Sequence, residues 1–189
     1  MKLLAYEVDK RPFLGVFNEN ETWAYPISAA GMEYRSMKDL IREAGPSEME
    51  MLDYISKKAP GDVMGAAPVD EIRVVSPIAE PDQDIICLGI NYMDHAAESA
   101  RFQKEEFARP EKAIYFSKRV NRTNDPDGII PAHKNLTNQL DYEAELAVII
   151  KKDAKDVKPE EVKDYIFGYT IMNDVSAREV QTEHKQWYF

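Results

Sequence analysis

Residues 140–150 read Leu-Asp-Tyr-Glu-Ala-Glu-Leu-Ala-Val-Ile-Ile, and this run is the most informative stretch of the chain. In a strand, side chains alternate between faces, so one face would carry Tyr142 and aliphatic groups only. Glu143 and Glu145 would project together from the other face. Two like charges so placed repel each other unless a cation or a shared proton relieves them. The run therefore predicts either a strand presenting two carboxylates to a divalent metal ion or an edge strand with two solvated glutamates.

A second segment, residues 167–179, favours the metal alternative. It reads Phe-Gly-Tyr-Thr-Ile-Met-Asn-Asp-Val-Ser-Ala-Arg-Glu, an apolar strand that ends at Asn-Asp before a helix start. Ser176 and Glu179 have the spacing of a capping box. This pattern would place Asp174 and Arg178 at a strand-to-helix junction. A third carboxylate at such a junction could join the first two on one hard cation.

A third run, residues 89–98, reads Gly-Ile-Asn-Tyr-Met-Asp-His-Ala-Ala-Glu. Together the three runs resemble the signatures of the fumarylacetoacetate hydrolase family, in the family's order and over roughly residues 84–189. The resemblance implies three groups of site residues: metal ligands Glu143, Glu145 and Asp174; catalytic His95 and Glu98; and substrate-binding Arg178 and Gln181.

Elementary chemistry is consistent with these implied roles. An all-carboxylate ligand set suits Mg²⁺ or Mn²⁺, with Ca²⁺ also possible, better than Zn²⁺. A 2-oxo acid chelates such a metal, which then acts as a Lewis acid for the enolate. Arg178 can bind the substrate carboxylate in a fork. In a helix, His95 and Glu98 would share a face, so Glu98 could orient the imidazole that takes a proton from water. An ordinary solvated His/Glu pair is the alternative.

The resemblance implies metal-dependent hydrolysis of a carbon–carbon bond in a 2,4-dioxo acid of acylpyruvate or fumarylacetoacetate type, as in aromatic compound catabolism. The same chemistry would serve isomerisation of 2-hydroxyhepta-2,4-diene-1,7-dioate or hydroxymuconate-type acids, and decarboxylation of oxaloacetate-type acids. Family members usually continue past the position of Phe189, so we expect the C-terminal part of the family domain to be absent. Trp187, Tyr188 and Phe189 would then lack cover, and a truncated metal-binding relic with impaired catalysis is the remaining alternative.

Composition narrows the classes of partner. The formal net charge of −10 and the isoelectric point near 4.9 argue against nucleic acids and anionic membranes. The single cysteine, Cys87, excludes an internal disulfide and suits a reducing compartment. The first residues lack a signal-peptide core, and no apolar run has the length of a transmembrane span. We therefore expect a cytoplasmic protein, and the family resemblance implies a homodimer.

The expected fold class is α+β and rich in strands, with a division near residue 75. Residues 1–75 would form a small N-terminal domain, with short strands over 1–27, a turn at 18–21, helices over 36–45 and 47–59, and a strand near 72–77. Residues 76–189 would form the metal-dependent catalytic domain. The resemblance implies a mixed β-sandwich roll for that domain, incomplete at its C-terminal end.

Overall fold

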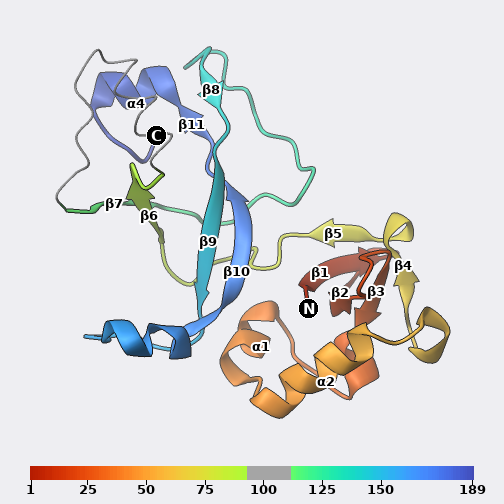
Figure 1. Cartoon of the computed structure of the whole chain (residues 1–189). Helices are drawn as coiled ribbons and strands as arrows, with labels where there is room; N and C mark the ends of the chain where they lie inside the picture. The colour runs from red at the N-terminus through yellow and green to blue at the C-terminus, as the bar shows by residue number, and fades with distance from the viewer. Residues whose placement is uncertain (93–111) are drawn as a thin grey trace. The chain divides into compact units, whose positions relative to one another are not determined.

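The structure is a computed structural model that describes residues 1–92 and 112–189 (Figure 1). The chain forms two compact units, each built from segments that are distant in sequence. The first unit contains residues 1–79, 123–129 and 146–170, and the second contains the described parts of 80–122, 130–145 and 171–189. The boundary near residue 75 stays a prediction. Among the described helices, none combines the length and apolar character needed to cross a membrane.

The first unit contains a five-stranded antiparallel sheet in the order β4-β3-β2-β1-β5. Its strands are β1 (Leu3–Val8), β2 (Arg11–Phe17), β3 (Trp23–Pro26), β4 (Ala67–Pro68) and β5 (Arg73–Val75). Asp9 and Lys10 connect β1 to β2 with φ of 49° and 64°. Two positive φ values are those of a tight hairpin turn that matches the twist of the strands. The strands predicted within residues 1–27 and near 72–77 are confirmed.

Two helices contribute to the apolar core of this unit. Helix α1 (Met37–Glu43) begins where the Ser36 side chain accepts a hydrogen bond from the backbone N–H of Asp39 at 3.1 Å. Helix α2 (Pro46–Ser56) begins with proline, which has no N–H to leave unsatisfied. Both helices were predicted, and their apolar positions are buried with strand residues. The buried core contains Val16, Tyr25, Ile27, Met32, Met37, Leu40, Ile41, Leu52, Ile55 and Val63.

Short elements complete the described chain. Four 3₁₀ helices lie at η1 (Ile27–Ala30), η2 (Pro60–Asp62), η3 (Val69–Glu71) and η4 (Pro159–Asp164). In the second unit, β6 (Ile85–Gly89) pairs antiparallel with β7 (Ile114–Lys118), and β8 (Leu140–Asp141) pairs antiparallel with β11 (Ser176–Ala177), which leads into α4 (Arg178–His184). Strand β9 (Ala144–Ile150) pairs with β10 (Ile166–Asn173), and both strands contribute residues to the two units.

The strand predicted for residues 140–150 is interrupted, because residues 142 and 143 lie in no strand and β8 pairs with β11 while β9 pairs with β10. The predicted alternation is present in β9. Glu145, Ala147 and Ile149 share the half-buried face. The apolar side chains of Leu146 and Val148 lie on the other face and are 59% and 47% exposed. The face that carries Glu145 is therefore the more buried one.

The predicted capping box at Ser176 and Glu179 is wrong. Ser176 is only 2% exposed and pairs with Asp141 in the β8–β11 ladder, so it cannot serve as a helix cap. Helix α4 instead follows Ala177, whose side chain accepts no capping hydrogen bond. The Glu179 carboxylate accepts from the Thr137 hydroxyl and the Asn138 N–H, each at 2.7 Å. These bonds lower the pKa of Glu179, the Asn138 bond having the larger effect.

Trp187 is partly covered, although the C-terminal aromatics were expected to lack cover, and it still counts among the exposed large side chains. Its ring centroid lies 6.1 Å from that of Phe116. Atom Cζ3 of its indole lies 3.0 Å from the place that a Cβ on Gly89 would occupy. Tyr188 and Phe189 contact each other, with centroids 4.6 Å apart. Trp187 remains 41% exposed, so its indole is only partly covered.

Candidate functional site

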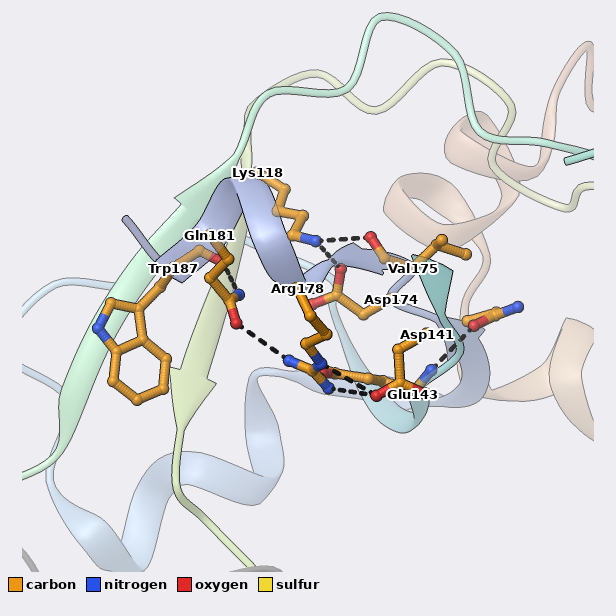
Figure 2. A network of polar contacts seen from close by, with 9 residues as sticks. Lys118, Asp141, Glu143, Asp174, Val175, Arg178, Gln181 and Trp187 are labelled. Carbon is orange, nitrogen blue, oxygen red and sulfur yellow. Dashed lines mark hydrogen bonds and ion pairs between the residues drawn. The ribbon is translucent and has the colours of Figure 1, made fainter. Parts of the chain in front are cut away.

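Two of the three predicted acidic residues, Glu143 and Asp174, lie where two segments of the second unit run side by side (Figure 2). The backbone N–H of Asp174 donates to the carbonyl of Glu143 at 2.8 Å. The N–H of Glu143 donates in turn to the side-chain oxygen of Asn173 at 3.1 Å. Residues 140–143 and 173–176 are thus joined by their backbones, which brings two of the three predicted metal ligands to one place.

Asp174 is buried and forms an ion pair with Lys118, which the sequence analysis did not predict. The ammonium of Lys118 lies 2.6 Å from Oδ1 of Asp174 and also donates to the carbonyl of Val175 at 3.0 Å (Figure 2). The side chains of Asp174 and Lys118 are 6% and 14% exposed. A signal for Lys118 exists in the sequence, because alternation along β7 places it on the inner face with Ile114 and Phe116. A charge in that position requires a partner of opposite sign.

Arg178 lies between two carboxylates. Its Nη2 forms ion pairs with Glu143 and, at 2.9 Å, with Asp141, while Nε donates to Asp141 at 3.0 Å. Burial alone would lower the pKa of Arg178, but the hydrogen bond to Asp141 and the charge of Glu143 outweigh it and raise that pKa. The guanidinium is therefore a fixed positive charge. Asp141, which has no assigned role in the sequence reading, is the residue that anchors it.

Gln181 lies beside Arg178, as the implied substrate-binding pair requires. Its side-chain oxygen accepts from Nη1 of Arg178 at 3.1 Å, and its side-chain nitrogen donates to the carbonyl of Trp187 at 3.1 Å (Figure 2). The carbonyl of Trp187 is an acceptor only, so it sets which end of the amide faces the guanidinium. The C-terminal segment thereby orients a residue of the candidate site.

The donor chemistry of Glu143, Glu145 and Asp174 fits a hard divalent cation, since all their side-chain donors are carboxylate oxygens. Within residues 1–92 and 112–189, however, no group of three or more His, Cys, Asp or Glu side chains lies close enough together to hold a metal ion. Lys118 and Arg178 contact two of the three carboxylates instead. A cation would have to replace these basic groups, and the ligand assignment stays a prediction.

The remaining candidates are placed as follows. His95 and Glu98 lie outside the described residues, so their acid/base roles stay predictions. Cys87 is half-buried, and burial, followed by the charge of Asp174, raises the pKa of its thiol. A raised pKa disfavours the nucleophilic thiolate form of this side chain.

Residues 84–189 match the family model described as fumarylacetoacetate (FAA) hydrolase, C-terminal. The chain is 39% identical over 133 residues to oxaloacetate tautomerase YisK of Bacillus subtilis, covering 69% of this chain and 43% of that protein. It is 29% identical over 196 residues to the uncharacterized protein SERP0556 of Staphylococcus epidermidis, covering 98% of this chain and 63% of the relative. The chain thus spans less than two thirds of these relatives.

Solved structures confirm the strand-rich α+β fold. A fumarylacetoacetate hydrolase from psychrophilic Exiguobacterium antarcticum aligns with a TM-score of 0.68 and 29% identity, over 100% of this chain and 60% of that one. A 5-carboxymethyl-2-hydroxymuconate delta-isomerase from Mycobacterium smegmatis aligns with a TM-score of 0.61 and 23% identity, over 99% of this chain and 60% of that one. The second likeness concerns the fold alone.

Proposed function

The chain belongs to the fumarylacetoacetate hydrolase family, and on that premise we propose that it carries the metal and substrate site of an enzyme acting on small 2-oxo acids. The observation that carries the proposal is the adjacency of a backbone-linked acidic pair, Glu143 and Asp174, to a charged guanidinium, Arg178. Carboxylates of this kind bind a hard cation, and a guanidinium binds the carboxylate of the substrate.

The residues of the chain have distinct roles in this proposal. Glu143, Glu145 and Asp174 would hold Mg²⁺ or Mn²⁺. When bound, that cation would supply Lewis-acid stabilisation of negative charge on the keto oxygen of the substrate. Arg178, kept in place by Asp141 and Gln181, would bind the substrate carboxylate. His95, oriented by Glu98, would move the proton, as the family resemblance implies.

We place keto–enol tautomerisation of an oxaloacetate-like acid first among the reactions. The observation that favours it is the 39% identity to an oxaloacetate tautomerase over 133 residues. Tautomerisation transfers one proton between carbon and oxygen, so it requires a positioned acid/base group and charge stabilisation, but no attacking water.

Hydrolysis of a carbon–carbon bond in a 2,4-dioxo acid is the second candidate. It is favoured by the likeness to the Exiguobacterium fumarylacetoacetate hydrolase, at 29% identity over the whole chain. Hydrolysis shares the enolate and the substrate carboxylate contact but adds water as a nucleophile. A base such as His95 would therefore be needed to take the proton from that water.

The experiment that tests the proposal follows both reactions by ultraviolet absorbance in Mn²⁺ or Mg²⁺, with oxaloacetate and a series of acylpyruvates as substrates. Arg178→Met should lower kcat/KM by about tenfold or more, mainly through KM, because a charge-assisted contact to the substrate is lost. Arg122→Met is the matched control, since Arg122 lies in the same unit with 62% of its side chain exposed. Equal losses in both variants, or no turnover of either substrate class by the wild-type chain, would overturn the proposal.

A further inference from the structure

Basic side chains pair with two of the three proposed metal ligands. The Lys118–Asp174 pair is nearly excluded from solvent, with side chains that are 14% and 6% exposed. The Arg178–Glu143 pair is more open, at 32% and 20%. Lys118 and Arg178 therefore already place two positive charges against the acidic site. Neither charge belongs to the set of groups that the family resemblance assigns to the metal.

Lys118 and Arg178 each have a second hydrogen-bond acceptor. Each would keep that acceptor if the paired carboxylate left it to bind a metal cation. Lys118 donates to the carbonyl of Val175 at 3.0 Å. Arg178 holds Asp141 through two nitrogens, at 2.9 and 3.0 Å. These second partners lower the cost of separating either ion pair, because neither cation is left without a hydrogen-bond acceptor.

We infer that Lys118 and Arg178 are resident counter-ions of the acidic site, and that a divalent cation binds there by exchange, displacing Lys118 from Asp174 and Arg178 from Glu143. This inference rests on the proposed metal site. Exchange has two physical consequences. The site keeps its shape in the absence of metal, because the repulsion among its carboxylates is relieved. The displaced ammonium stays a few ångströms from the incoming cation and weakens its binding by repulsion.

Lys118 gives the sharper test, since it has no proposed contact with substrate. In the full chain, Lys118→Gln keeps a donor for the carbonyl of Val175 but removes the competing charge. Its dissociation constant for Mn²⁺, measured by isothermal titration calorimetry, should fall by about tenfold relative to wild type. Lys118→Arg keeps the charge and should bind Mn²⁺ within about twofold of wild type. Lys134→Gln makes the same formal charge change at an exposed position of the same unit and should also match wild type.

Unchanged or weaker Mn²⁺ binding by folded Lys118→Gln would overturn the exchange, since weaker binding is what a lysine that only positions Asp174 would produce. If wild type bound Mn²⁺ but Lys118→Gln did not fold, crystal structures of the wild type grown with and without Mn²⁺ would test the exchange instead. The Lys118 ammonium should move from 2.6 Å to beyond 4 Å from Oδ1 of Asp174. An ammonium that stayed within hydrogen-bond distance in the Mn²⁺ complex would refute the inference. Failure of wild type to bind Mn²⁺ would refute the proposed metal site itself.

Discussion

The Lys118–Asp174 pair makes a quantitative prediction for the protein without metal. Asp174→Asn removes the carboxylate and leaves the ammonium of Lys118 with 14% exposure. Breaking a buried pair in this way costs about 3–5 kcal/mol, because a charge loses its counter-ion but not its burial. The carbonyl of Val175 remains as an acceptor at 3.0 Å, and a hydrogen bond to a charged group offsets about 1.5 kcal/mol of that cost. We therefore expect a loss of about 1.5–3.5 kcal/mol in the free energy of unfolding.

The assay is urea unfolding in EDTA for wild type, Asp174→Asn, Lys118→Gln and the double variant. The double-mutant cycle should return a coupling energy of about 2 kcal/mol, since the double variant contains no unpaired charge. The Lys2–Glu21 pair is the matched control, because it has the same 2.6 Å separation but side chains that are 66% and 49% exposed. Glu21→Gln should leave the stability unchanged. If Asp174→Asn lowered the free energy of unfolding by less than about 0.5 kcal/mol, the reasoning would be refuted, because a loss that small is typical of a solvent-exposed ion pair.

Three further predictions concern the rest of the molecule. The pKa of Glu179 is lowered in the folded state. The ionised carboxylate therefore stabilises the folded protein above the ordinary glutamate pKa, and this contribution is lost as pH falls through the folded-state pKa. The difference in Tm between wild type and Glu179→Gln should therefore shrink from about pH 7 to about pH 3. Gly89→Ala would place a Cβ 3.0 Å from the Trp187 indole, so a red-shifted tryptophan emission is expected, and an unshifted spectrum would show that the packing differs. Leu52→Ala should cost about 2–5 kcal/mol in urea unfolding, whereas Met64→Ala, at a position 85% exposed, should match wild type; equal effects would contradict the described core.

Patterns in the sequence predicted the helices and strands whose formation depends on residues close to one another in the chain. The alternation in residues 144–150 identified the side chains that share a face with Glu145, because strand periodicity is a property of the backbone. Helices α1 and α2 were predicted from the helical spacing of their apolar residues, which is also a local signal. The resemblance of residues 84–189 to one family was confirmed as well.

The features that the sequence did not reveal depend on segments that meet only in the fold. Lys118 reaches Asp174 across a separation of 56 positions (174 − 118), and no spacing rule connects two such residues. The capping box failed because Ser176 is buried by the pairing of β8 with β11, a tertiary constraint that overrides a local preference. Trp187 has a packed face because Gly89 has no side chain to exclude it.

Whether the carboxylates bind a divalent cation is the central question for this chain. Calorimetric titration of Mn²⁺ into wild type, Glu143→Gln and Asp174→Asn tests it most directly, with Glu160→Gln as the control at an exposed acidic position. We predict saturable binding at one site in wild type and in the control, and loss of that binding in the other two variants. Binding by Glu143→Gln or Asp174→Asn that equals the wild type would contradict the account.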